Sequence, residues 1–247
     1  MTPLTTLEAI YCIAVMLLAY GLRGSTGFGG AIGMPLLALA IPIKVLVPVW
    51  TLLGFASSIA ILGRERRHVA WRAFAAFVPW CLLGVAVGLY LFRTLDARLL
   101  ARGLGVMVLA YASYSLWGAT RKTRVNDAAR RVLGPAASII AGAVGTLFGT
   151  MASVFFAMYL DARALGKDAF RATMSAMLLT LSAVRGAGYY AIGEFSREVW
   201  LTFAAALPLM LIGIWAGDRI QVRLSEQAFR RIVCGTLTVC GIALLLR

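Results

Sequence analysis

Two arginines stand where a charged side chain is least expected. Arg185 lies deep within the apolar stretch 181–186, and Arg23 lies where the first apolar run of the chain is interrupted. A charge inside such sequence is costly and marks a functional site by default. Guanidinium groups, exposed backbone N–H groups and hydroxyl groups are the donors that hold oxyanions. The chemistry that these residues suit is therefore the binding of a small oxyanion.

The elements that must position these donors are two interrupted pairs of apolar segments. The first pair is 7–22 and 28–41, and the second is 133–147 and 149–160. At 1.5 Å per residue the last segment reaches only about 18 Å, against about 30 Å for the hydrocarbon of a bilayer. We therefore expect either half-helices or hairpins that enter the membrane and return, and the sequence leaves both open.

The interruptions supply further donors beside the two arginines. Glycine permits tight turns and lets a ligand approach the backbone, and the N–H groups at the start of a helix attract anions. The candidate substrate-binding residues are Arg23, Ser25, Thr26, Gly27, Phe28, Gly29, Gly30, Thr146, Gly149, Thr150 and Arg185.

The composition predicts an integral membrane protein. The chain has 247 residues, of which 61% are hydrophobic and 14% charged, whereas soluble domains have about 45–50% and about 25%. These values exclude a soluble enzyme, a secreted disulfide scaffold and a disordered chain. The apolar runs are continuous and do not alternate, which argues against a porin-type barrel. The first apolar run has no Arg or Lys before it, so we interpret it as a membrane helix and not as a cleaved signal peptide.

Six further runs are long enough for full-length helices. With the two interrupted pairs they predict an all-α, polytopic helical membrane protein of about eight to ten membrane segments. The six runs are residues 45–63, 69–92, 103–119, 172–192, 199–217 and 232–246.

The two halves of the chain resemble one another. A shift of 129 positions places Trp71 on Trp200 and Pro79 on Pro208, and it also aligns Gly84 with Gly213. We therefore expect a membrane repeat over 1–120, a cytoplasmic linker over 121–131 and a second membrane repeat over 132–247, forming one integrated transmembrane domain.

The distribution of charge gives the expected orientation. The net charge of +14 comes from Arg and Lys clustered in short gaps between apolar runs, which is typical of cytoplasmic membrane loops and not of a nucleic-acid surface. The loops assigned to the cytoplasm, 64–72, 121–131, 163–171 and 219–231, make the Trp71 helix start inside and the Trp200 helix start outside. The two repeats are therefore expected to be inverted.

Inverted repeats with interrupted helices indicate a secondary transporter, with its site near the membrane midplane at the ends of half-helices. No Asp or Glu lies deep in an apolar run, which favours an anionic substrate over a cation. Lys167 and Arg171 are interpreted as topology determinants. Trp71, Trp200, Tyr189 and Tyr190 are interpreted as anchors at the membrane interface.

Two stretches resemble a known family. Residues 27–36, Gly-Phe-Gly-Gly-Ala-Ile-Gly-Met-Pro-Leu, resemble the glycine-rich first motif of the TauE/SafE sulfite and organosulfonate exporters. Residues 166–173, which end in Phe-Arg-Ala-Thr, are similar to a signature in the second half of that family. The second glycine motif, at 148–153, lacks the glycine run and the proline of the family. The resemblance implies export of sulfite or a small sulfonate across the inner membrane without ATP.

These observations together predict a multi-pass transporter of the bacterial inner membrane that exports a small oxyanion by alternating access. An anion channel, or an importer of sulfur compounds on the same fold, stays open as an alternative. No catalytic residue, metal or cofactor is expected. The expected partners are the small anionic substrate and the lipid bilayer, with no nucleic acid, and a homodimer stays open.

Overall fold

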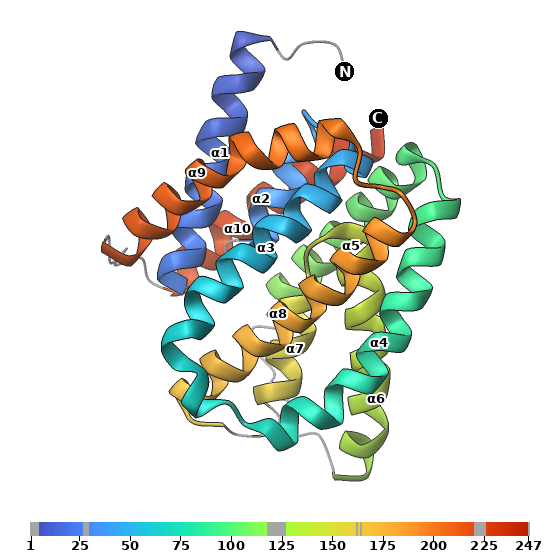
Figure 1. Cartoon of the computed structure of the whole chain (residues 1–247), viewed down its shortest axis with the longest axis vertical. Coiled ribbons are helices and arrows are strands. Elements are labelled where there is room, and N and C mark those ends of the chain that lie inside the picture. Colours follow the sequence, from blue (N-terminus) through green and yellow to red (C-terminus); the bar gives the residue numbers. More distant parts are fainter. Residues whose placement is uncertain are drawn as a thin grey trace. The chain divides into compact units, whose positions relative to one another are not determined.

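The computed structural model describes residues 5–26, 30–117, 127–161, 163, 165–219 and 226–246. Every regular element in these ranges is helical, which confirms the predicted all-α fold class (Figure 1). The first five helices are α1 (Thr6–Thr26), α2 (Gly30–Leu37), α3 (Ile43–Glu65), α4 (Trp71–Thr94) and α5 (Ala97–Trp117), with the short 3₁₀ turn η1 (Arg66–His68) before α4. The next five are α6 (Asp127–Phe148), α7 (Ala152–Asp161), α8 (Lys167–Ala191), α9 (Arg197–Arg219) and α10 (Glu226–Leu246).

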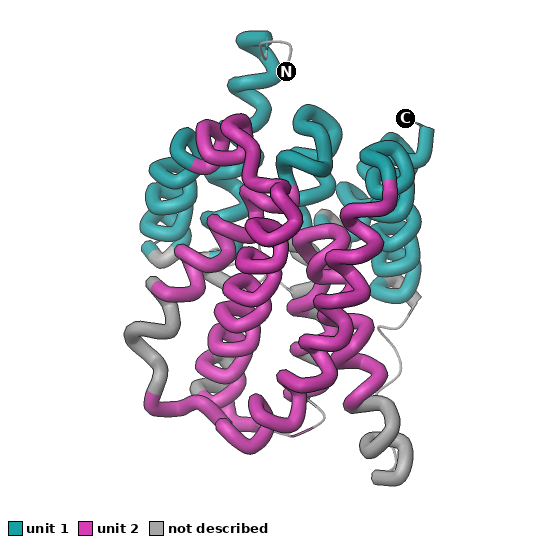
Figure 2. Tube along the Cα trace, turned by 45° about the vertical axis from the view of Figure 1, so that its right-hand side comes forward, with its two compact units in different colours: residues 1–46, 96–122, 204–247 teal, residues 47–95, 123–203 magenta. Residues whose placement is uncertain are grey.

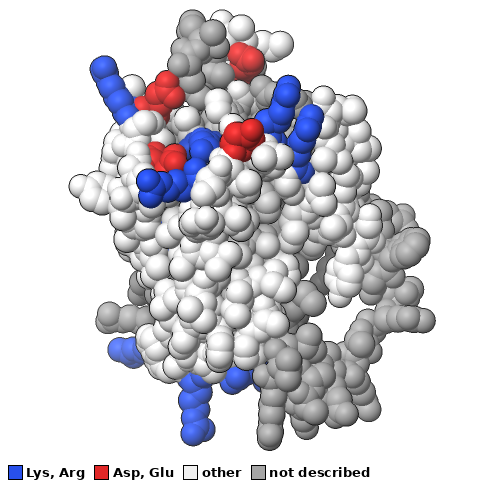
Figure 3. Space-filling view, turned by 90° about the vertical axis from the view of Figure 1, so that its right-hand side faces the viewer, with Lys and Arg blue, Asp and Glu red and all other residues white. Residues whose placement is uncertain are grey.

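Several helices have the length and apolar character of membrane spans. Thr6–Arg23, Trp71–Thr94 and Arg197–Gly217 are long and apolar enough to cross a membrane, and shorter apolar stretches occupy α3, α6 and α10. Figure 3 shows the charged side chains of the described residues gathered in patches, with a broad uncharged surface that carries none of them. A polytopic helical membrane protein follows from these features.

The two interrupted pairs have the same construction. In each pair the first helix is long, with 21 residues in α1 and 22 in α6. The second is short, with 8 residues in α2 and 10 in α7, which corresponds to about 12 and about 15 Å. Each pair therefore consists of a full-length helix followed by a helix that is too short to span the hydrocarbon.

The chain forms two compact units, and each takes segments from both halves of the sequence (Figure 2). Unit 1 comprises residues 1–46, 96–122 and 204–247, and unit 2 comprises residues 47–95 and 123–203. The boundaries of the sequence repeats stay a proposal.

Unit 2 is built around a close contact between α4 and α6. A Cβ added at Gly84 would stand 2.0 Å from the carbonyl oxygen of Ile139, and one added at Gly142 would stand 2.2 Å from that of Cys81. Small residues let membrane helices approach this closely. The core of unit 2 continues through α7 and α8, where Phe77 meets Phe156 edge to face with ring centroids 4.9 Å apart.

Unit 1 contains a comparable glycine contact. A Cβ at Gly217 of α9 would stand 2.0 Å from the carbonyl oxygen of Gly21 in α1. In the same unit α5 packs on α10, where a Cβ at Gly105 would stand 2.9 Å from the carbonyl oxygen of Gly241. Gly84 and Gly213, which the 129-residue shift aligns, both lie at tight helix contacts, since a Cβ at Gly213 would stand 2.8 Å from Cβ of Tyr20.

Candidate functional site

Arg185 lies at the centre of the candidate site in unit 2. Its side chain is only 4% exposed. One terminal nitrogen, Nη1, donates a hydrogen bond to the carbonyl oxygen of Gly145 at the end of α6. The other, Nη2, is 3.9 Å from the point where a Cβ on Gly54 of α3 would stand. The guanidinium is therefore enclosed by α3, α6 and α8.

The end of α6 explains why a cation is stable at this depth. The last carbonyl groups of a helix have no partner within it, and they form the negative end of the helix dipole. Two side chains one turn apart on α8 serve consecutive carbonyls, since Arg185 donates to Gly145 and the Tyr189 hydroxyl donates to Thr146. The α6 terminus thus receives both hydrogen bonds and a compensating charge.

The position of Tyr189 contradicts the role predicted for it from the sequence. It was expected to anchor the chain at the membrane interface, but its side chain is fully buried. Tyr190, with 73% of its surface exposed, has the exposure of an anchor, as do Trp71 and Trp200. The sequence does not distinguish two adjacent tyrosines, because the decision depends on which one faces α6.

The segment between α6 and α7 has an unusual backbone. Gly149 and Met151 have φ angles of 68° and 67°. The left-handed region is uncommon for a residue other than glycine, and such residues concentrate at functional sites. The two residues lie in the short turn that carries the chain from the end of α6 to the start of α7.

The start of α7 and the guanidinium flank the same glycine. A Cβ added at Gly145 would stand 2.8 Å from Cβ of Ala152, the first residue of α7, and 4.0 Å from Nη1 of Arg185. Backbone N–H groups at a helix start and a guanidinium are both anion donors. The end of one helix, the start of the next and a buried cation therefore meet at Gly145.

Three hydroxyl-bearing residues of unit 2, Thr146, Thr150 and Ser182, are buried. Thr146 is fully buried and donates to the carbonyl of Gly142 at 2.7 Å, and Thr150 is 7% exposed. Ser182 was not among the predicted residues. Its Oγ is 3.2 Å from the point where a Cβ on Gly54 would stand. Its spacing of three residues from Arg185 could have indicated it, because residues i and i+3 share one face of a helix.

The predicted residues fall into three groups. Unit 2 contains Thr146, Gly149, Thr150 and Arg185, of which Arg185 and the backbone N–H of Gly149 both donate to the carbonyl of Gly145. In unit 1, Arg23 lies in the last turn of α1, which ends with Ser25 and Thr26, and Gly30 begins α2. Gly27, Phe28 and Gly29 lie outside the described residues.

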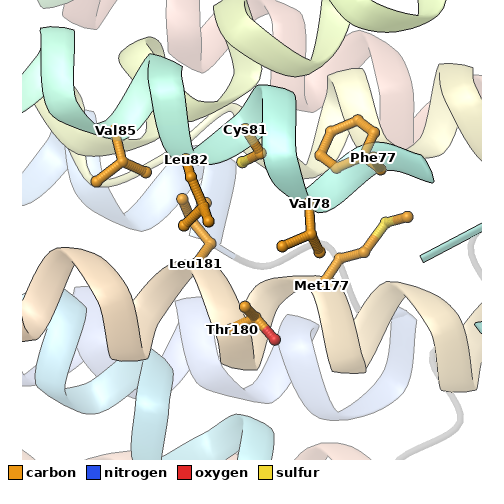
Figure 4. Close-up of a pocket in the computed structure, with 8 residues that line it drawn as sticks. All are labelled: Phe77, Val78, Cys81, Leu82, Val85, Met177, Thr180 and Leu181. Carbon is orange, nitrogen blue, oxygen red and sulfur yellow. The ribbon is translucent and has the colours of Figure 1, made fainter. Parts of the chain in front are cut away.

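A narrow crevice lies beside the site, between α4 and α8 (Figure 4). It has room for about one water molecule and is partly open to the surroundings. The Thr180 hydroxyl is the one polar side-chain oxygen in its lining and donates to the carbonyl of Ala176 at 3.0 Å. Leu181 joins the crevice to the site, since its Cδ2 is 3.0 Å from the Cβ position of Gly145. The remaining lining residues are Phe77, Val78, Cys81, Leu82, Val85 and Met177.

The donor set identifies the kind of ligand that the site can hold. It includes a guanidinium and helix-start N–H groups, and the acidic residues of α6, α7 and α8 lie in their first or last turns. Within the described residues no group of three or more His, Cys, Asp and Glu is placed to hold a metal ion. The arrangement suits an oxyanion.

Fold and site together define a polytopic helical membrane protein with a buried, cationic site at a helix interruption. Comparison with known proteins places it more narrowly. The family described as sulfite exporter TauE/SafE matches residues 12–244, so the chain belongs to the TauE/SafE family. It is a multi-pass transporter of the inner membrane, in a family of transporters of sulfur compounds and not of enzymes.

One curated relative is the probable inner membrane transporter protein TsaS of Comamonas testosteroni. It is 28% identical over 201 residues, which cover 78% of this chain and 80% of the relative. No solved structure matches the chain.

Proposed function

We propose that this protein exports a small sulfur oxyanion, sulfite or an organosulfonate, by alternating access at the Arg185 site. The observation that carries the proposal is the buried guanidinium of Arg185, held at Gly145 beside the first residue of α7. A charge-assisted hydrogen bond is about twice as strong as a neutral one. The site therefore has strong donors for a sulfonate or sulfite headgroup.

The membrane potential supports the direction. An inside-negative potential favours exit of an anion by about 2.3 kcal/mol per charge per 100 mV. Export of a monovalent anion therefore needs no ATP. The same physics makes import of the anion unfavourable without a coupling ion.

The crevice favours a substrate with a short apolar tail. Leu181 lies one helical turn before Arg185, which is about 6 Å along α8. A headgroup at Arg185 would leave an attached methyl group beside the buried side chains of Cys81, Val85 and Leu181. Burial of one methylene group contributes about 0.8 kcal/mol, so an alkylsulfonate gains affinity over sulfite.

Flux from proteoliposomes tests the proposal. Vesicles loaded with labelled sulfite or methanesulfonate should release it faster with the protein than without it. Unlabelled substrate on the opposite side should accelerate the release, because a carrier that returns loaded exchanges faster. Chloride and acetate at equal ionic strength serve as controls and should neither move nor accelerate the release.

Three results would contradict the proposal. Unitary current steps in planar bilayers would assign the protein to the channel class. Net accumulation of sulfonate by whole cells that depends on this protein would assign it to import. Absence of flux for every sulfur oxyanion would remove the proposed substrate class.

A further inference from the structure

Two donors on α8 share the carbonyl groups that end α6. Nη1 of Arg185 donates to Gly145, and the hydroxyl of Tyr189 donates to the next carbonyl, that of Thr146. The spacing of four residues puts both side chains on one face of α8. The end of α6 therefore competes with any bound anion for the donors of this face.

The guanidinium can divide its donors in two ways. It carries five N–H groups in a planar fork, and such a fork fits two acceptors that lie side by side. If the Thr146 carbonyl were open, the fork could turn onto both carbonyls of α6 and direct its strongest donors there. With the Tyr189 hydroxyl on Thr146, the fork contacts α6 through Nη1, and its Nη2 side lies toward Gly54 of α3.

Tyr189 is fixed well enough to exclude Arg185 from that carbonyl. Its ring packs edge to face on Phe92, with centroids 5.0 Å apart. Both rings are fully buried. The neighbouring Gly188 lies against Leu89, where an added Cβ would stand 2.2 Å from Leu89 Cδ1. This packing therefore holds the Tyr189 hydroxyl in place against the carbonyl of Thr146.

We propose that Tyr189 is a positioning residue for anion binding, which occupies the Thr146 carbonyl and so keeps the Arg185 guanidinium from turning both of its terminal nitrogens onto α6. The inference rests on the proposed function and adds to it a residue that does not contact the anion. It assigns to Tyr189 an effect on affinity that requires the forked side chain of Arg185.

A double-mutant cycle tests this role. The variants are Tyr189→Phe, which removes only the hydroxyl, Arg185→Lys, which keeps the charge but not the fork, and the double variant. The measured quantity is KM for sulfite efflux from proteoliposomes, with maximal rate and melting temperature recorded for each. Tyr190→Phe is the matched control, since this side chain is the next along α8 and is 73% exposed.

The expected result is a non-additive change in KM. Tyr189→Phe should raise KM about three- to tenfold when Arg185 is present, which is the range of one neutral hydrogen bond. The same substitution should raise KM less than about twofold in the Arg185→Lys background. Maximal rate should change little, because the folded transporter is otherwise intact. Tyr190→Phe should leave KM unchanged in both backgrounds.

Other outcomes overturn the inference. An equal rise of KM in both backgrounds would show that Tyr189 acts on the fold and not through the arginine. An unchanged KM in Tyr189→Phe would show that the Thr146 carbonyl does not compete for Arg185. If the wild-type protein transports no sulfur oxyanion, the proposed function fails first and this inference with it, so that the two failures are distinguishable.

Discussion

The two ends of α8 perform different tasks. Near its start, in the stretch that resembles the family signature, the buried Thr173 accepts a hydrogen bond from the backbone N–H of Ala70 at 2.9 Å. It also donates to the carbonyl of Ala169 at 2.6 Å. Ala70 is the N-cap residue of α4 and supplies no side-chain cap of its own, so this end of α8 secures the start of another helix.

The second half of α8 carries the candidate site. Ser182, Arg185 and Tyr189 are all buried there, and two of them serve the end of α6. None of the three lies in the signature-like stretch. The comparison teaches that the signature-like stretch of α8 makes an architectural contact, while the residues proposed to bind the substrate lie in a stretch without a motif.

Loss of the Arg185 charge should give the largest effect. Arg185→Gln removes charge-assisted hydrogen bonds worth about 1.5–3 kcal/mol, so sulfite efflux should fall about 10- to 100-fold. The control is Arg163→Gln, just before α8, where the exposed guanidinium lies 4.9 Å above the ring of Tyr159. Equal losses of efflux in the two variants would contradict the particular role assigned to the second half of α8.

Gly145→Ala should affect both folding and transport. The added Cβ would meet Ala152 at 2.8 Å and Leu181 at 3.0 Å, and overpacking of this kind costs about 1–3 kcal/mol. Thermal unfolding in detergent should show the loss. Gly235→Ala is the control because a Cβ there has no atom within 4 Å. A fully stable Gly145→Ala protein would contradict the tight meeting of α6, α7 and α8.

Thr173→Val should lower stability and leave affinity intact. The substitution keeps the shape of the side chain but removes the acceptor for Ala70, and an unsatisfied buried donor costs about 1–3 kcal/mol. The melting temperature should fall, while KM for sulfite efflux should stay within about twofold of wild type. A rise in KM as large as that in an Arg185 variant would place the signature-like end in the substrate site as well.

Filling the crevice should give the smallest and most selective effect. Leu82 lines it and Leu83 does not, and they are 41% and 55% exposed. Leu82→Trp should weaken binding of methanesulfonate about fourfold relative to sulfite, since burial of one methyl or methylene group contributes about 0.8 kcal/mol. Leu83→Trp should leave this ratio unchanged. A change in the ratio from Leu83→Trp alone would place the tail elsewhere.

The sequence was sufficient to predict the all-helical fold and the deep position of Arg185. Continuous apolar runs predicted the all-α fold, and the depth of Arg185 in its run indicated its importance. Which side chains donate hydrogen bonds to the last carbonyl groups of α6 could not be predicted from the sequence. Tyr189 and Ser182 belong to the candidate site because α8 meets α3 and the end of α6 around Arg185, and only the packing of distant segments determines that meeting.

The most direct test of the central claim is a titration of the purified protein with methanesulfonate. Wild type, Arg185→Gln and Arg163→Gln would be compared in detergent, with acetate and chloride at equal ionic strength as controls. The account predicts saturable binding to wild type and Arg163→Gln, weakened at least about tenfold in Arg185→Gln. Equal dissociation constants for wild type and a folded Arg185→Gln protein would contradict it.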